Sequence, residues 1–238
     1  MSKTAASLLA RSDEVAGTYV RRRYAILFYL LLFTFVASPL LTALNRTPRI
    51  IELLLATTLS VAVLPMGTGN AKRVVLVLVV IALSGRLLAA SLGQAFSTAS
   101  HAIFTLVGLL AAANALRSAL RATSIDSEHI YAALSAYLLA GLSFGVLYWA
   151  LEHAWPGSLV YGGNRVDSFS ESDGVYFSFV TLATLGYGDF VPKTDVARGL
   201  VILEAVAGQL YLGVMVARLV SLYVSGAGAG KQAGPDVR

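Results

Sequence analysis

The chain has 238 residues with a formal net charge of +5; 57% are hydrophobic, only 13% are charged, mean hydropathy is +0.73, and there is no cysteine. Soluble globular proteins carry about 25% charged residues, so this composition excludes an ordinary water-soluble enzyme, and its low charge excludes a disordered chain. The absence of cysteine excludes a disulfide scaffold, thiol chemistry and a Cys-ligated metal site. The composition therefore predicts an integral membrane protein.

Apolar runs suited to membrane-crossing helices follow a polar N-terminal segment. Residues 1–23 end in three arginines, and the apolar run behind them is about 20 residues long, which suits a membrane span rather than a signal peptide. The second predicted span is the weakest because it is short and carries Glu52. The six predicted spans are Tyr24–Leu44, Ile50–Pro65, Val74–Leu92, His101–Leu120, Glu128–Leu151 and Val196–Val224.

The basic residues predict the orientation of these spans. Lys and Arg concentrate on the side that holds both termini, within residues 3–23, 72–73, 117–121 and 218–238. Because positive residues favour the cytoplasmic side, we expect both termini in the cytoplasm. Arg117 and Arg121 are expected to contact lipid headgroups. The positive charge therefore requires no nucleic-acid partner.

Between the fifth and sixth spans, residues 152–195 are too polar to cross a membrane, but they contain one short apolar segment. Gly174–Thr184 is about 11 residues long, which suits a re-entrant helix. It leads into Thr184-Leu185-Gly186-Tyr187-Gly188, where the two glycines permit backbone conformations that direct successive carbonyl oxygens toward one axis. Four copies around that axis would form stacked rings of oxygens able to replace the water shell of an alkali cation.

The nine residues from Thr181 to Asp189 resemble the selectivity filter of potassium channels, Thr-x-x-Thr-(Val/Ile)-Gly-Tyr-Gly-Asp, with Leu185 at the position that is usually β-branched. The resemblance covers residues 128–224 and implies a homotetramer with an outer helix 128–151, a pore helix 174–184, a filter 184–188 and an inner helix 196–224. It implies that the filter, completed by Gly188, binds K⁺ as the permeant ion, with no other cofactor, at Thr184, Leu185, Gly186 and Tyr187.

The same resemblance implies roles for residues around the filter. Asp189 and Thr181 would support the filter, although the pore-helix glutamate that partners the aspartate in many relatives is replaced by Val180. Gly208 falls at the hinge glycine of the inner helix, and Gly213 could serve equally well; close helix packing is the alternative reading of Gly208. Gln209 is a candidate for lining the cavity of the pore.

Glu204 is a carboxyl in the middle of the last span, which is costly and suggests a function. The first hypothesis places it behind the pore helix, near Ser178 or Thr181, where it would stabilise the filter. Under this hypothesis Glu204→Gln would lower the stability of the filter. The second is a pore-facing charge that concentrates cations. The third is a protonated carboxyl satisfied within its own helix.

The first four spans predict a voltage-sensor-like bundle over residues 24–122, ahead of a pore domain over 123–224 and a flexible cytoplasmic tail over 225–238. The fourth span lacks the repeated arginines of a voltage sensor, so we expect weak or absent voltage dependence. Glu52 and Arg86 are candidates for a buried ion pair in this bundle. His101 and His153, at extracellular ends of spans, could respond to pH, although lone interfacial histidines are usually inert.

These features together predict a tetrameric potassium channel that conducts K⁺ passively, in the plasma membrane of a bacterium. The alternative is a less selective monovalent cation channel on the same frame. We find no convergent nucleophile and base, no metal-ligand spacing and no phosphate loop, so the sequence does not predict an enzyme. It also lacks the paired broken helices of a transporter.

Overall fold

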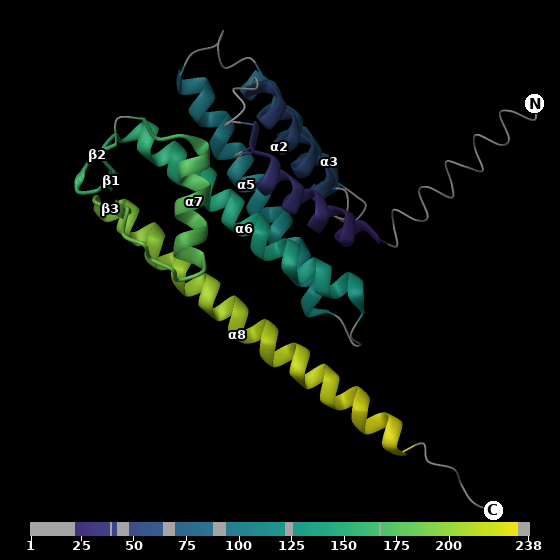
Figure 1. Ribbon diagram of the computed structural model, residues 1–238. Coiled ribbons are helices and arrows are strands. Elements are labelled where there is room, and N and C mark those ends of the chain that lie inside the picture. The colour runs from purple at the N-terminus through teal and green to yellow at the C-terminus, as the bar shows by residue number, and fades with distance from the viewer. Residues whose placement is uncertain are drawn as a thin grey trace, which may run out of the picture.

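The computed structural model describes residues 22–38, 40–41, 48–63, 70–87, 94–121, 126–166 and 168–232. Most of them are helical (Figure 1). Residues 22–38 form the first helix, followed by α2 (Pro48–Val63), α3 (Asn70–Leu87), α5 (Gln94–Leu120), α6 (Ser127–Ala154), α7 (Glu171–Leu182) and α8 (Asp195–Gln232). The fold is therefore the helical membrane architecture that the composition predicts.

Among the described residues, three helical stretches are long and apolar enough to cross a membrane: Ser100–Leu120, Ser127–Ala154 and Asp195–Leu222. They correspond to the predicted fourth, fifth and sixth spans. The earlier predicted spans coincide with helices, but α2 has only 16 residues. The count of six spans therefore stays a prediction.

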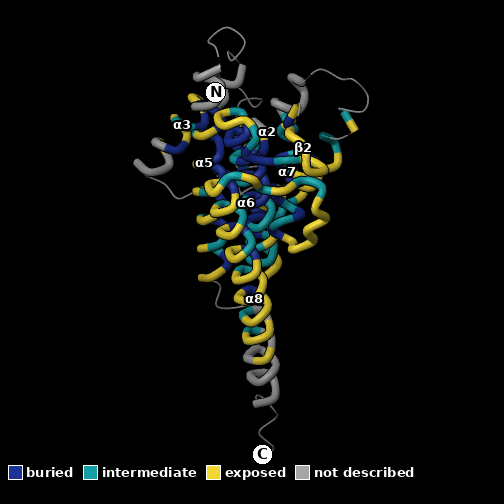
Figure 2. Tube along the Cα trace, turned by 90° about the vertical axis from the view of Figure 1, so that its left-hand side faces the viewer, coloured by how far each residue is buried: buried dark blue, intermediate teal, exposed yellow. Residues whose placement is uncertain are grey.

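The N-terminal helices pack against α6 of the same chain. A continuous cluster of buried side chains joins the first helix, α2, α3, α5 and α6, with Leu27, Leu59 and Phe104 among its members. The carboxylate of Glu128, in the first turn of α6, accepts a hydrogen bond from the backbone N–H of Tyr24 at 3.0 Å. Figure 2 shows buried residues gathered in this bundle, whereas α8 presents mostly exposed residues.

Helix α7 lies across α6 at backbone contact distance. A Cβ built on Gly174 would lie 2.3 Å from the carbonyl oxygen of Gly145, and one built on Gly145 would lie 2.5 Å from Cα of Val175. Gly141 similarly faces the ring of Phe179. Small residues four apart allow this close approach between membrane helices, so the Gly141–Gly145 spacing fixes where α7 sits.

The ends of α7 differ from the prediction of 174–184 for a physical reason. Ser170 is the N-cap residue: its hydroxyl accepts a hydrogen bond from the backbone N–H of Asp173, whose carboxylate accepts from the N–H of Ser170. This capping box starts the helix at Glu171 rather than Gly174, because it satisfies backbone donors left free at a helix start. The helix ends at Leu182, before Thr184 turns into a left-handed conformation.

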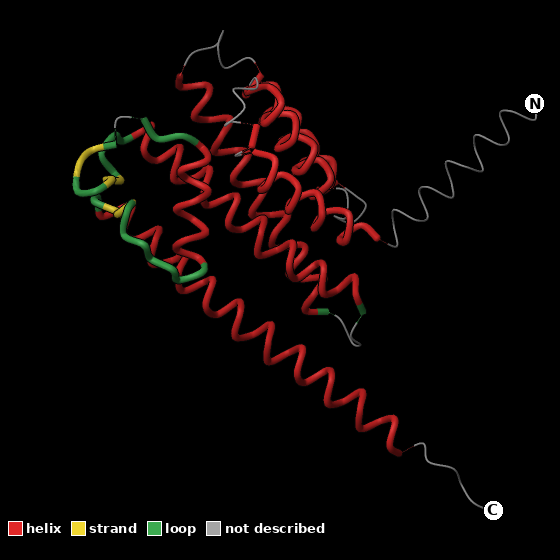
Figure 3. Tube along the Cα trace, in the orientation of Figure 1, coloured by secondary structure: helices red, strands yellow, loops and turns green. Residues whose placement is uncertain are grey.

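The structure also contains a small sheet, so the prediction of an all-α protein was incomplete. The strands are β1 (Leu159–Tyr161), β2 (Asn164–Arg165) and β3 (Phe190–Pro192), in the antiparallel order β2-β1-β3 (Figure 3). β1 and β2 are joined by Gly162 and Gly163, both with positive φ, which is the geometry of a two-residue hairpin turn. The sheet thereby ties the segment after the filter to the loop that follows α6.

Candidate functional site

The backbone between α7 and β3 alternates in handedness. Thr184, Gly186 and Gly188 have φ values of +57°, +55° and +79°, and no other described residue between 183 and 189 has a positive φ. When left-handed and right-handed residues alternate, successive peptide planes turn their polar groups the same way. The alternation therefore supplies the conformation that the glycine spacing predicts.

Among the described residues, backbone N–H groups within 184–188 are hydrogen-bonded, whereas the carbonyl oxygens are not. The backbone N–H groups of Leu185 and Gly186 both point back to the carbonyl oxygen of Val180, at 2.9 and 3.3 Å. Within the described parts of the chain, the carbonyl oxygens of residues 184–188 accept no hydrogen bond. They are therefore available as ligands, and oxygen atoms are the ligands that alkali cations take in a filter.

The filter segment lies on the surface of the single chain. Residues 183–188 are all exposed, and the side chains of Leu185 and Tyr187 are 56% and 68% exposed. No other described part of the single chain covers these side chains. One chain alone does not enclose a cation with these carbonyl groups.

Asp189 has a partner that the sequence analysis did not identify. The hydroxyl of Tyr176, on α7, donates a hydrogen bond to its carboxylate at 2.7 Å, and the backbone N–H of Phe190 donates another at 2.9 Å. The Tyr176 hydrogen bond holds the pKa of Asp189 below its ordinary value. Tyr176 lies one helical turn before Val180, so the aspartate is anchored from a different turn of the pore helix.

Replacing Tyr176 with phenylalanine should remove this anchor without changing the packing of the ring. The hydrogen bond from Tyr176 lowers the pKa of Asp189 and so keeps its carboxylate ionised as the pH falls. Loss of this hydrogen bond should raise the pKa of Asp189, so that ion flux is inhibited by acid at a higher pH than in the wild type. Flux measured as a function of pH in Tyr176→Phe tests this, with Tyr161→Phe as the control; an unchanged pH profile would contradict the anchoring role.

The small sheet holds the outer end of the filter. The backbone N–H of Gly162 donates to the carbonyl oxygen of Asp189 at 3.0 Å, and the rings of Tyr161 and Phe190 lie 4.9 Å apart. The carboxylate of Glu152, near the end of α6, accepts from the backbone N–H groups of Gly157 and Leu159 at 2.6 and 2.8 Å. The loop after α6 is thus fastened at both ends.

Glu204 lies behind the pore helix, at the place that the first hypothesis gave it. It is fully buried; its carboxyl oxygens lie 2.5 Å from the Ser178 hydroxyl on α7 and 2.7 Å from the Tyr148 hydroxyl on α6. Its described partners are therefore on other helices, unlike in the third hypothesis, and its burial in the single chain disfavours the second. The effect on the filter stays a prediction.

The other predicted site residues are placed differently. A Cβ on Gly208 would lie 2.8 Å from the Leu182 carbonyl oxygen, so this glycine allows close packing of α8 on the end of α7. α8 is a continuous helix through Gly208 and Gly213, and nothing lies within 4 Å of a Cβ on Gly213. Gln209 is exposed, and Thr181 is half-buried. The hinge, cavity-lining and support roles of these four residues stay predictions.

Three residues of the N-terminal bundle were singled out in the sequence, and the structure describes the side chain of His101 but not those of Glu52 and Arg86. Glu52 and Arg86 belong to α2 and α3, but their side chains lie outside the described part of the structure, so their ion pair stays a prediction. His101 is buried, and its Nε2 lies 2.9 Å from the carboxylate of Glu171 at the start of α7. Its ring stacks 4.0 Å from that of Trp149. His101 therefore links α5 to the pore helix.

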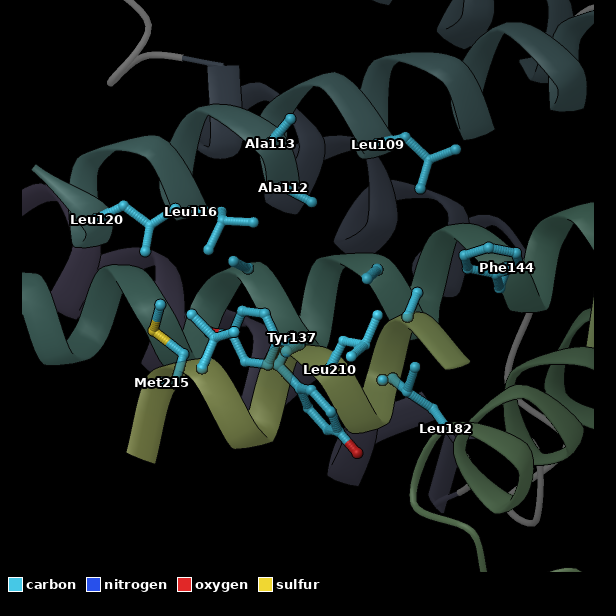
Figure 4. A pocket seen from close by; sticks show the side chains of 16 residues that line it. Leu109, Ala112, Ala113, Leu116, Leu120, Tyr137, Phe144, Leu182, Leu210 and Met215 are labelled. Carbon is cyan, nitrogen blue, oxygen red and sulfur yellow. The ribbon is translucent and has the colours of Figure 1, made fainter. Parts of the chain in front are cut away.

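An apolar cavity of about 420 Å³ lies between α5, α6 and α8 (Figure 4). The side chains that line it include Leu116 on α5, Tyr137 on α6, Leu182 on α7 and Met215 on α8. Neither Gln209 nor any of residues 183–188 is among the lining residues. The cavity is therefore separate from the surface that carries the filter carbonyl groups.

Comparisons with known proteins each cover part of the chain. Residues 133–225 match a family model described as “Ion channel”. An 88-residue stretch is 34% identical to two-pore potassium channel 4 of Arabidopsis thaliana, covering 37% of this chain and 28% of that protein. An 82-residue stretch is 37% identical to inward rectifier potassium channel Kirbac3.1 of Paramagnetospirillum magnetotacticum, covering 33% and 24%. The chain thus spans about a quarter of these relatives, and no solved structure matches it.

Proposed function

We propose that the protein conducts K⁺ passively and selectively through a pore built from four copies of the chain. The match of residues 133–225 to a family model described as “Ion channel”, and the similarity of parts of the chain to potassium channels, support this proposal. The observation that carries the proposal is the alternating backbone of residues 184–188, with carbonyl oxygens that accept no hydrogen bond within the described chain. Thr184, Leu185, Gly186 and Tyr187 would bind the ion, and Gly188 and Asp189 would hold the outer end.

Four copies are proposed because one chain carries one filter and leaves it exposed. The exposed apolar residues of α8, including Ile202, Val206 and Leu210, supply a surface that neighbouring chains would cover. The C-terminal end of α7 leads directly into the filter, and a helix C-terminus carries partial negative charge. Four such ends around an axis would favour a cation.

The proposed pore has weak or no voltage dependence. From Ser100 to Leu116 α5 carries no Lys or Arg, and its only basic residue in the last turn is Arg117. A charge moved across the membrane contributes about 2.3 kcal/mol per 100 mV, so a helix without charges inside the field supplies little energy for gating. We place the protein in the plasma membrane with both termini cytoplasmic, as the distribution of basic residues favours.

The proposal is tested by reversal potentials of the purified protein in planar bilayers, with K⁺ on one side and Na⁺ on the other. We expect reversal near the K⁺ equilibrium potential and an open probability that changes less than twofold between negative and positive voltages, a rough figure that follows from the missing gating charges. Reversal near zero would favour the less selective cation channel instead. Steep voltage dependence would contradict the reading of α5.

A further inference from the structure

Three helices of the pore domain meet at one buried set of oxygen atoms. Tyr148 on α6, Ser178 on α7 and Glu204 on α8 are each fully buried. The Tyr148 hydroxyl donates to Oε2 of Glu204 at 2.7 Å. The Ser178 hydroxyl oxygen lies 2.5 Å from Oε1 of Glu204 and 2.7 Å from the carbonyl oxygen of Gly141 on α6. Three oxygen–oxygen contacts of this length each require a hydrogen atom between them.

The number of hydrogen atoms depends on the state of the carboxyl. A serine hydroxyl carries one hydrogen, a carbonyl oxygen carries none, and an ionised carboxylate only accepts. If Glu204 were ionised, Ser178 could fill either its contact with Glu204 or its contact with Gly141, but not both. The other pair would face each other at hydrogen-bond distance with only lone pairs between them.

A protonated Glu204 fills all three contacts. Its own hydrogen lies on Oε1 and is donated to Ser178, Ser178 donates to Gly141, and Tyr148 donates to Oε2. Within the described residues no Lys, Arg or His contacts Glu204, so an ionised form would be a buried charge with no opposite charge to balance it. The count of hydrogen-bond donors and the absence of a balancing charge among the described residues both favour a protonated Glu204.

We infer that Glu204 is held as a neutral carboxylic acid, which acts as a positioning residue by joining the pore helix to the outer and inner helices through the chain Tyr148–Glu204–Ser178–Gly141. Ser178 lies only a few residues before the filter, so this junction fixes the helix from which the filter extends. The inference rests on the proposed function for its link to conduction, but the protonation state itself does not.

The inference reverses the effect that the sequence led us to expect from Glu204→Gln. A glutamine side chain has nearly the same shape, with an amide oxygen to accept from Tyr148 and an N–H to donate to Ser178. It therefore supplies both contacts of a neutral acid, with one additional N–H, whereas an ionised carboxylate has no donor for Ser178. Alanine provides neither group and leaves two buried hydroxyl groups without this partner.

Infrared spectroscopy of the full-length protein in lipid vesicles at neutral pH tests the protonation state directly. We expect a carbonyl stretching band of a protonated carboxyl group that shifts in D₂O and disappears in Glu204→Gln. Glu152→Gln is the matched control, because Glu152 is a buried carboxyl whose two oxygen atoms accept hydrogen bonds from backbone N–H groups, so these contacts need no hydrogen atom on the carboxyl. A wild-type spectrum without a band that Glu204→Gln removes would overturn the inference.

Ion flux in the same vesicles tests the positioning role. We expect Glu204→Gln to keep K⁺ over Na⁺ selectivity within about twofold of the wild type and Glu204→Ala to lose at least about tenfold, since only glutamine restores the junction. Equal losses in the two variants would overturn the role. If the wild-type protein itself does not select K⁺, the proposed function fails, while the infrared band still decides the protonation state.

Discussion

Gly186→Val should abolish selective K⁺ conduction. Gly186 has a φ of +55°, and nothing lies within 4 Å of a Cβ built on it, so the obstacle is backbone conformation rather than space. A left-handed conformation costs a residue with a side chain about 1–2 kcal/mol, and a β-branched residue adopts it rarely, as Thr184 does here. In a pore of four chains the cost rises to roughly 4–8 kcal/mol, enough to favour another filter conformation.

The measurement is K⁺ and Na⁺ flux from vesicles that contain equal amounts of assembled protein. Gly199→Ala is the matched control, because Gly199 lies in α8 without a positive φ and without a neighbour within 4 Å of its Cβ. We expect this control to keep wild-type flux. Wild-type selectivity in Gly186→Val would show that the left-handed conformation at this position is not what forms the cation site.

Gly174→Leu should prevent the pore helix from docking on the outer helix. A Cβ at this position already lies 2.3 Å from the carbonyl oxygen of Gly145, and a backbone atom cannot move aside as a flexible side chain can. Overpacking usually costs about 1–3 kcal/mol, and more where backbone must shift. Because α7 carries the filter, we expect the protein to lose both assembly and conduction.

Size-exclusion chromatography in detergent and thermal unfolding measure this effect. Ser172→Leu is the control, since Ser172 is an exposed position on the same helix and should leave the unfolding temperature nearly unchanged. Gly174→Ala is expected to be intermediate, with a lowered unfolding temperature. If Gly174→Leu assembled and unfolded like the wild type, the backbone contact between α6 and α7 would not be what positions the pore helix.

The left-handed conformations within residues 184–188 could be predicted in part from the sequence, whereas the binding of a cation by this segment stays a prediction. Glycine is the residue type that adopts left-handed conformations freely, so glycine at positions 186 and 188 predicts a left-handed backbone there. Thr184 adopts it without being glycine, and only the structure shows this. The contact of Glu204 with Ser178 agrees with one of the three hypotheses that the sequence left open, and the structure was needed to choose among them.

Other contacts depend on how helices and loops pack against one another, and they could not be predicted from a single sequence. Tyr176 reaches Asp189 because the chain beyond α7 turns back toward that helix. Tyr148 on α6 reaches Glu204 on α8 because these helices pack together beside α7, and α6 meets α7 at backbone distance. The Gly141–Gly145 spacing was the available signal for that crossing. The sheet was missed because strands of two or three residues are too short for an alternating pattern, although Gly162-Gly163 is a recognisable hairpin turn.

The exposed filter of the single chain has a genetic consequence. If four chains share one axis, every pore contains four independent opportunities for a defective filter. In a cell that makes equal amounts of intact and defective chains, only about one pore in sixteen would be free of defective subunits when assembly is random. A filter mutation that leaves assembly intact would therefore be dominant, whereas one that blocks docking of the pore helix would remove its own chain and be recessive.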